Sequence, residues 1–172
     1  MAVAVLLAAC GGDDDESSVT TTVPVGPTGT RTTATAAVPF DGATTPVSTP
    51  PAGEKHDLKA VRVGAHEGFN RVVFEFDGGV PGYSVKYVER PIIADGSGDE
   101  VTVGGGAVLE VRLEPAMGAD VSRRIAGTDE IVEVVKTGDF EAVVHFAVGV
   151  RDRAPFKVIT SEGTTLIVDI ER

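Results

Sequence analysis

The 172-residue sequence has one cysteine, no tryptophan and two tyrosines. A single cysteine excludes an internal disulfide, and it excludes CxxC and cysteine-cluster metal sites. Basic residues are also scarce, because 15 Lys and Arg stand against 26 Asp and Glu, giving a formal net charge of −11. An acidic chain without a basic stripe argues against nucleic acid or polyanionic lipid as the main partner.

The N-terminal apolar run, residues 1–9, is too short to span a bilayer, which needs roughly 20 residues. It ends in Leu7-Ala8-Ala9-Cys10, which resembles a bacterial lipobox. The resemblance implies that residues 1–10 form a lipoprotein signal segment and lipobox, that residues 1–9 are removed and that Cys10 carries a lipid. We therefore expect a lipid-anchored, extracytoplasmic protein on the outer face of the cytoplasmic membrane.

One feature of a signal peptide is missing, since such a segment starts with Lys or Arg and none occurs before Arg31. We expect the true start to lie upstream of Met1. The alternative is a short apolar N-terminus in which Cys10 occurs by chance.

Residues 11–54 show no hydrophobic periodicity and are rich in Thr, Pro, Ala, Gly and Ser. Such a stretch buries too little apolar surface to offset the entropy of ordering it. We predict a disordered Thr/Pro-rich linker that lets a folded domain stand away from the bilayer and approach the cell wall.

Residues 55–172 have the composition of one globular domain. They carry 14 Lys and Arg and 20 Asp and Glu, a formal charge of −6. Apolar and polar residues alternate with period 2, for example where Val72, Phe74 and Phe76 face away from Arg71 and Glu75. Strands are predicted at 58–65, 71–76, 83–88, 108–113, 131–136, 140–150, 156–160 and 165–170.

Gly-rich turns separate these strands, including predicted turns at 77–82, 95–98, 104–106, 137–139 and 161–163. Eight or so short strands with such turns indicate an all-β fold, a sandwich or an open barrel. The segment Pro115–Gly127 fits either a loop or one short helix. A weak internal repeat, in which Val72–Phe76 is similar to Val143–Phe146, fits a sandwich of two related halves.

Five short motifs occur in an order that resembles the AMIN-like domain of actinobacterial lipoproteins. They are Gly82-Tyr-Ser-Val-Lys-Tyr-Val88, Asp95-Gly-Ser-Gly98, Gly138-Asp-Phe-Glu141 with Val148-Gly149, Pro155-Phe-Lys-Val158 and Leu166-Ile-Val-Asp-Ile170. The chain is also similar to the AMIN domains of cell-wall amidases and secretins.

The AMIN-like resemblance covers about residues 57–171. It implies a β-sandwich of two small sheets and a non-catalytic role, binding peptidoglycan or an envelope partner. One departure is the segment Ser161–Thr165, where the family tends to have a Pro and an Arg before the last strand. If that Arg contacts a ligand in relatives, this chain lacks the contact.

Catalytic and metal-binding signatures are scarce. The histidines His56, His66 and His145 are isolated in sequence, and we read His145 as a surface residue on the outward side of a strand. Asp95, Ser97 and Asp99 alternate as Ca²⁺ ligands can, but the spacing of an EF-hand loop is absent and a solvated turn is favoured. We therefore expect no enzyme activity, no metal and no cofactor.

The sequence does not single out a ligand-binding set. Tyr83 and Tyr87 share a strand face with Val85. This pattern favours core residues whose hydroxyls reach the edge of the core, rather than exposed rings that bind a sugar. Four basic strand residues could bind the carboxylates of a ligand. These are Arg62, Arg71, Lys86 and Arg112. The alternative for each of them is an ordinary solvent-exposed strand residue.

Three functions remain open, in this order. The first is a membrane-tethered module that binds peptidoglycan or localises to the wall. The second is a protein–protein interaction module of an envelope complex, which pairs through an exposed strand edge. The third is a hydrolase with scattered acids, which needs a cleft holding two carboxylates with perturbed pKa values.

Overall fold

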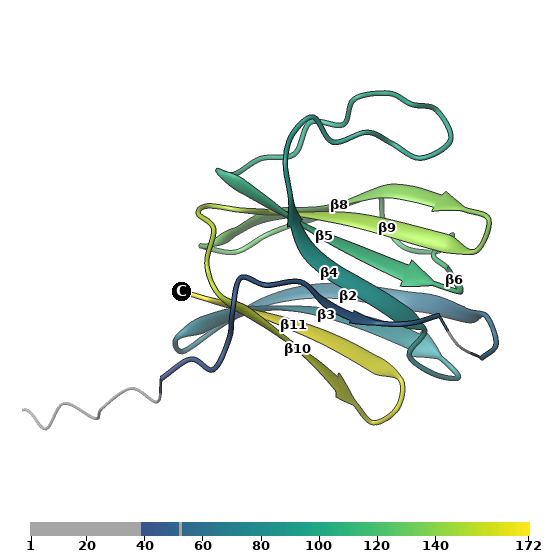
Figure 1. Cartoon of the computed structure of the whole chain (residues 1–172), viewed down its shortest axis with the longest axis horizontal. Coiled ribbons are helices and arrows are strands. Elements are labelled where there is room, and N and C mark those ends of the chain that lie inside the picture. The colour runs from purple at the N-terminus through teal and green to yellow at the C-terminus, as the bar shows by residue number, and fades with distance from the viewer. Residues whose placement is uncertain (1–38, 52) are drawn as a thin grey trace, which may run out of the picture. The chain divides into compact units, whose positions relative to one another are not determined.

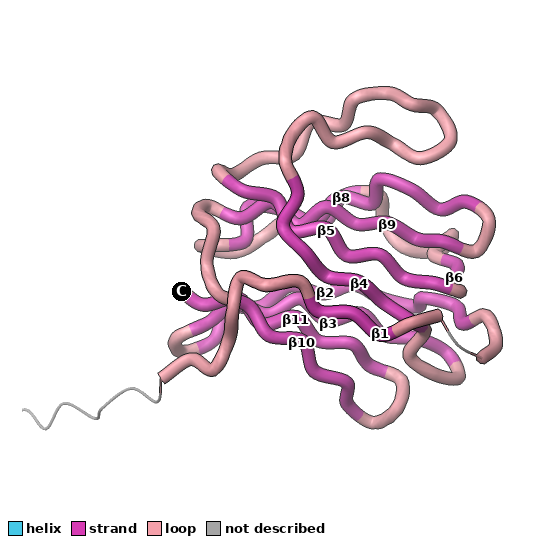
Figure 2. The backbone as a smooth tube through the Cα atoms, in the orientation of Figure 1, coloured by secondary structure: helices cyan, strands magenta, loops and turns pink. Residues whose placement is uncertain are grey.

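The computed structural model describes residues 39–51 and 53–172 as two β-sheets packed face to face (Figure 1). The predicted all-β sandwich is confirmed, and the described chain contains strands and loops only (Figure 2). Within these residues, no helix of the length and apolar character needed to cross a membrane is present.

The first sheet has six strands in the order β1-β4-β5-β9-β8-β7, all neighbours antiparallel. The strands are β1 (Val47–Thr49), β4 (Gly82–Val88), β5 (Ala107–Glu114), β7 (Arg124–Ala126), β8 (Ile131–Phe140) and β9 (Val143–Val150).

The second sheet has five strands in the order β10-β11-β3-β2-β6, and only the short β2–β6 pairing is parallel. The strands are β2 (His56–His66), β3 (Phe69–Asp77), β6 (Ala116–Met117), β10 (Phe156–Ser161) and β11 (Thr165–Glu171).

The topology contains two related halves. In the first, hairpin β2–β3 lies in the five-stranded sheet and the chain then crosses to β4 and β5 in the other sheet. In the second, hairpin β8–β9 lies in the six-stranded sheet and the chain crosses to β10 and β11. Strands β10-β11-β3-β2 of one sheet and β4-β5-β9-β8 of the other therefore follow the same order, with each hairpin of the first half matched by one of the second half. This arrangement agrees with the weak repeat in the sequence.

The core lies between the two sheets and is built from the alternating strand positions. Phe74 on β3 and Phe146 on β9 are fully buried, and their rings meet edge to face with centroids 5.3 Å apart. Phe156 is also buried and packs edge to face against Tyr87 at 5.8 Å. Aromatic pairs in this geometry stabilise beyond their area burial, so these contacts fix the two layers relative to each other.

The long loop 89–106 folds over the outer face of the six-stranded sheet, at the top of Figure 1. Val103 in this loop is buried with Val108, Val135 and Ala147, which point outward from the strands. The Arg90 side chain donates to the carbonyl oxygens of Val103 and Gly105 at 2.8 and 2.9 Å. One outer face of the sandwich is thus partly covered by its own loop.

Three segments differ from their prediction. Pro115–Gly127 contains the strands β6 and β7 rather than a helix, because its backbone pairs with β2 and β8. The predicted turn at 137–139 lies inside β8, where a bulge between Lys136 and Gly138 accommodates the glycine. The turn between β8 and β9 falls instead at residues 141–142, inside the strand predicted at 140–150.

The third difference concerns the predicted linker. β1 falls within residues 11–54 and pairs with the edge of β4, and Ala43 pairs with Phe156. Backbone pairing supplied by the domain orders this polar segment, which has no hydrophobic periodicity of its own. The folded unit therefore begins before residue 55, and residues 1–38 lie outside the described chain.

Candidate functional site

The outer face of the five-stranded sheet carries a group of aromatic and basic side chains that we call the aromatic–cationic face. His66 stacks on Phe69 with ring centroids 4.9 Å apart and planes 12° from parallel. Phe40 lies 6.3 Å from Phe69, between centroids. The basic members are Arg71 and Lys157, so the face consists of Phe40, His66, Phe69, Arg71 and Lys157.

Cations lie over the rings of this face. The guanidinium carbon of Arg71 is 5.2 Å from the Phe69 centroid, and Lys157 Nζ lies 5.1 Å from Phe40 and 5.9 Å from Phe69. These are cation–π distances. Among the described residues, Lys157 forms no ion pair with a carboxylate. The Lys157 ammonium is therefore available to an anionic group of a ligand.

A buried carboxylate anchors the face. Asp169 on β11 is the direct cross-strand neighbour of both Lys157 and Arg71, and its side chain is 1% exposed. Arg71 Nε and Nη2 donate to its two oxygens at 2.6 and 2.9 Å. The hydrogen bond to Asp169 raises the pKa of Arg71, which outweighs the lowering effect of burial. This two-point pair holds the guanidinium in one orientation beside Phe69.

An apolar row continues the same surface. Ile159, Ile167 and Val73 are successive cross-strand partners on β10, β11 and β3, and Arg62 on β2 ends the row. Ile159 is 37% exposed. The five-stranded sheet thus presents partly exposed apolar side chains next to the aromatic–cationic face.

Sequence reasoning missed this face because it looked for Trp and Tyr as ligand platforms. A signal was present in the alternation itself. On β3, Phe69 and Val73 alternate with Arg71 and Glu75 on the outward side of the strand. On β11, Ile167 lies on the same outward side as Asp169. Apolar residues at solvent-facing positions of a strand mark an interaction surface or a cover.

The predicted carboxylate partners are divided between the two sheets. Arg62 and Arg71 lie on the five-stranded sheet, whereas Lys86 and Arg112 lie on the outer face of the six-stranded sheet. Each already has an acidic partner within the domain. The pairs are Arg62–Glu75, Arg71–Asp169, Lys86–Glu110 and Arg112–Glu114.

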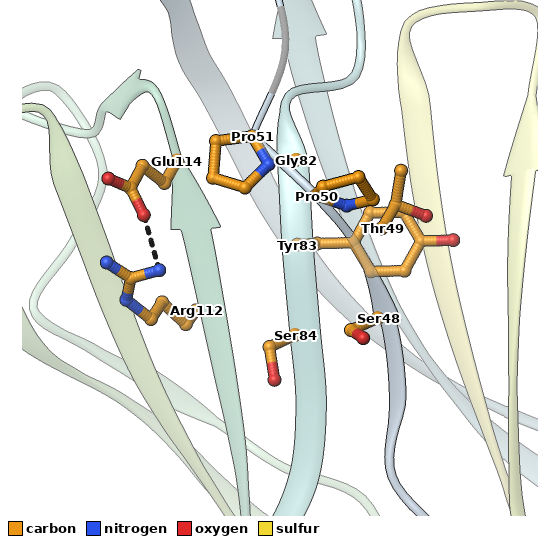
Figure 3. Close-up of a pocket in the computed structure, with 9 residues that line it drawn as sticks. All are labelled: Ser48, Thr49, Pro50, Pro51, Gly82, Tyr83, Ser84, Arg112 and Glu114. Atoms are coloured by element: carbon orange, nitrogen blue, oxygen red, sulfur yellow. Dashed lines mark ion pairs between the residues drawn. The ribbon is translucent and has the colours of Figure 1, made fainter.

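Arg112 and Tyr83 line a shallow hollow of about 350 Å³ where β1 joins β4 (Figure 3). Pro50 and Pro51 form one wall, and Arg112 turns toward Glu114 on the other side. Among the described residues that line the hollow, Arg112 is the one cation. It is therefore a weaker candidate for an anionic ligand than the aromatic–cationic face.

Tyr87 is a structural residue. Its hydroxyl donates to the Ala154 carbonyl oxygen at 2.7 Å and accepts from the Ala154 N–H at 3.1 Å. Burial raises the pKa of its phenol, against the lowering effects of the Ala154 hydrogen bond and of Arg153. The hydroxyl fastens the β9–β10 crossing to β4, which leaves it no free hydrogen-bonding role toward a ligand.

The sequence predicted that His145 is a surface residue, but the structure covers most of its side chain. It does point outward from β9, but loop 89–106 covers it, and its side chain is 21% exposed and pairs through Nδ1 with Asp95. The bare backbone of Gly138 makes room for this pair, because a Cβ there would collide with the Asp95 carboxylate. Asp95 therefore fastens the loop to the sheet.

Asp95, Ser97 and Asp99, the candidate Ca²⁺ ligands of the sequence, do not form a cation site. The Ser97 hydroxyl accepts the Asp99 N–H at 3.3 Å, a local turn contact. In the described part of the chain, no group of three His, Cys, Asp or Glu residues could hold a metal ion.

The pKa of Glu133 is lowered, because hydrogen bonds from the Gly104 N–H and Arg124 outweigh the raising effect of burial. A lowered pKa suits a structural anion rather than a general acid.

The family model described as the AMIN-like domain matches residues 56–172. The chain therefore belongs to the AMIN-like family, and the resemblance inferred from its strand motifs is confirmed. No curated protein and no solved structure gives a significant match.

Family membership indicates a module associated with the cell wall or envelope, in an extracytoplasmic location. AMIN-like domains are non-catalytic binding modules. The candidate lipidation residue Cys10 lies outside the described residues.

Proposed function

We propose that this protein is an envelope lipoprotein, tethered through a lipid on Cys10, whose AMIN-like domain binds peptidoglycan by the aromatic–cationic face. The observation that carries the proposal is the juxtaposition of stacked rings with Lys157, a cation that pairs with no described carboxylate. Aromatic rings offer a flat apolar surface to the C–H faces of sugars, and basic groups bind carboxylates of stem peptides.

The acidic character of the domain, with a formal charge of −6 over residues 55–172 alone, makes this local arrangement important. An acidic wall polymer is repelled at long range by such a domain, so binding depends on short-range contacts at one surface. The apolar row Ile159–Ile167–Val73 extends the contact area beyond the rings.

The test is sedimentation of the domain, residues 39–172, with purified peptidoglycan at low and high salt. Saturable binding by the native sequence is expected, with at least a fivefold loss for Lys157→Ala and for Phe69→Ser. The matched control is Lys86→Ala, which removes a lysine from the outer face of the other sheet and should bind within twofold of the native domain. Equal binding by Lys157→Ala and Lys86→Ala would reject the aromatic–cationic face.

The anchor is tested separately in cells that make the full chain. Native protein is expected in the detergent phase of a Triton X-114 partition, and Cys10→Ser in the aqueous phase. A protein that partitions identically with and without Cys10 is not anchored there, whatever its wall binding.

A further inference from the structure

Two arginines line one hollow at the end of the six-stranded sheet, where β4 ends and β5 begins. Arg90 lies on loop 89–106 and Arg153 on the crossing from β9 to β10. The hollow has a volume of about 430 Å³. Its other lining residues are Tyr87, Val88, Glu89, Gly106 and Ala107. It shares no residue with the aromatic–cationic face, so it is a separate surface.

The two arginines differ from most arginines of the domain in having no acidic partner. Among the residues that the structure describes, Arg90 and Arg153 form no ion pair with a carboxylate. Both are exposed, so a ligand can reach them. The arginines that do pair with an acid are Arg62, Arg71, Arg112, Arg124, Arg151 and Arg172.

Other contacts hold both guanidiniums in place. Arg90 Nη2 donates to the carbonyl oxygens of Val103 and Gly105 at 2.8 and 2.9 Å. The guanidinium carbon of Arg153 lies 4.7 Å from the centroid of the Tyr87 ring, a cation–π distance. The Tyr87 ring is fixed in turn by the two hydrogen bonds of its hydroxyl to Ala154. Because these cations are ordered without a ligand, binding an anion costs less side-chain entropy.

The acids near the hollow do not pair with its arginines. Glu89 lines the hollow, and Asp152 lies just outside the lining, with Oδ1 3.9 Å from the position of a Cβ on Gly106. Both acids are exposed, and neither forms an ion pair with a described residue. The lining itself carries two positive charges and one negative charge. A bound anion is therefore attracted by both arginines and repelled by Glu89.

The number of guanidiniums favours phosphate over carboxylate. On the other sheet of this domain, Arg71 alone donates to both oxygens of the Asp169 carboxylate. One guanidinium therefore satisfies one carboxylate, and a second needs further oxygen acceptors. A phosphate group has three or more oxygens and carries about −1.5 to −2 charges as a monoester near pH 7. It can accept from two guanidiniums at once and offset the charge of both.

We propose that the hollow between Arg90 and Arg153 binds a phosphate group. Soluble phosphate esters and phospholipid headgroups both present this group, and the experiment separates the two sources. The site does not depend on peptidoglycan binding, because the aromatic–cationic face lies on other residues. Lys157→Ala should therefore leave phosphate binding within twofold of the native chain, whatever it does to wall binding.

The first experiment titrates the purified full chain, carrying Cys10→Ser, with inorganic phosphate at low salt, followed by calorimetry. Saturable binding is expected, with at least a fivefold loss for Arg153→Ala and a smaller loss for Arg153→Lys, which keeps the charge without the planar fork. Glu89→Gln should bind more tightly, since it removes the repelling charge. Arg90→Ala should also lose binding, but it removes the two hydrogen bonds of the loop, so Arg153→Ala is the decisive variant.

The matched control is Arg123→Ala. Arg123 is an exposed arginine that pairs with no described carboxylate and lies outside this hollow. Its variant should bind phosphate within twofold of the native sequence, and circular dichroism checks that every variant is folded. Equal affinities of Arg153→Ala and Arg123→Ala would overturn the site, because binding would then follow the number of exposed arginines and not their position.

The second experiment measures sedimentation of the same chain with phosphatidylcholine vesicles, with and without phosphatidylglycerol. Binding that needs phosphatidylglycerol and is lost in Arg153→Ala assigns the site to a lipid headgroup. Binding of inorganic phosphate without binding to vesicles assigns it to a soluble phosphate. A chain that binds neither inorganic phosphate nor vesicles, or that binds both equally well as Arg153→Ala, would overturn the proposal.

Discussion

Arg71 on β3 and Asp169 on β11 are direct cross-strand neighbours joined by two hydrogen bonds, at 2.6 and 2.9 Å. Asp169 is buried on the outer side of its sheet, beneath the basic side chains of the aromatic–cationic face. A buried carboxylate needs a compensating charge. The same guanidinium therefore stabilises the sheet and orients the candidate binding surface.

Arg71→Ala is expected to lower the free energy of unfolding by about 3 kcal/mol, because it leaves a buried carboxylate without its cation. Urea denaturation of residues 39–172 measures this. The double variant Arg71→Ala with Asp169→Asn should recover part of the loss, since the orphaned charge is gone. A single-variant loss below about 1 kcal/mol would show that other groups compensate Asp169.

Glu133→Gln should give a pH-dependent loss of stability. The pKa of Glu133 is lowered in the folded protein, so its contribution is present above the unfolded pKa, about 4.3, and is lost as the pH falls through the lower folded value. We expect Glu133→Gln to cost about 1–2 kcal/mol at pH 7, from hydrogen bonds to a charged group. The difference from the native domain should shrink below pH 4.

The matched control for Glu133 is Glu67→Gln, an exposed acid at the β2–β3 turn. Its free energy of unfolding at pH 7 should equal that of the native domain, because the side chain is exposed. A Glu133→Gln deficit that stayed constant from pH 7 to pH 3 would mean that the loss comes from packing rather than from charge.

Removing residues 39–54 should destabilise the domain, although the sequence places the boundary at residue 55. The fragment 55–172 loses the pairing of β1 with β4 and the bridge between Ala43 and Phe156. At about 1 kcal/mol for each net hydrogen bond, the loss should exceed about 2 kcal/mol. It also exposes the β4 edge, so size-exclusion chromatography should show association.

A pair of phenylalanine variants separates the core from the surface. Phe74→Ala removes a fully buried ring that packs on Phe146, and it should cost about 3–5 kcal/mol. Phe140→Ala removes a ring that is 60% exposed, and it should change stability by about 0.5 kcal/mol or less. Thermal denaturation of the two variants side by side tests both values, and similar melting temperatures would contradict the assignment of Phe74 to the core and of Phe140 to the surface.

Ala142→Gly should raise the free energy of unfolding by about 1 kcal/mol, because glycine adopts a φ of 62° without the Cβ penalty. The measurement is urea denaturation. The opposite sign would mean that the turn is not strained as its backbone angles indicate.

The alternation of apolar residues was enough to predict the strands and the sandwich. Phe74, Phe76, Leu109 and Val111 each face the core as their period-2 pattern requires, because inward positions of a strand must exclude water. The motif order from Gly82 to Ile170 was also enough to identify the AMIN-like family. These features are local or sequential, so they can be read directly from the chain.

Segments ordered by distant partners were not predictable in the same way. β1 is polar and becomes a strand only because β4 offers an unpaired edge, and β6 and β7 form against β2 and β8. His145 points outward as its alternation indicates, yet loop 89–106 covers it through Asp95. The aromatic–cationic face depends on the meeting of Phe40, Phe69 and Lys157, which lie far apart in sequence.

The sequence by itself determined the all-β class, the core positions and the family, since strand alternation and motif order act within short stretches of chain. The tertiary structure decided where the folded unit begins, which basic residues are already paired and which aromatic side chains share a surface. Those properties follow from cross-strand register and loop packing, which bring residues 13 to 117 positions apart into contact, as Arg62–Glu75 and Phe40–Lys157 show.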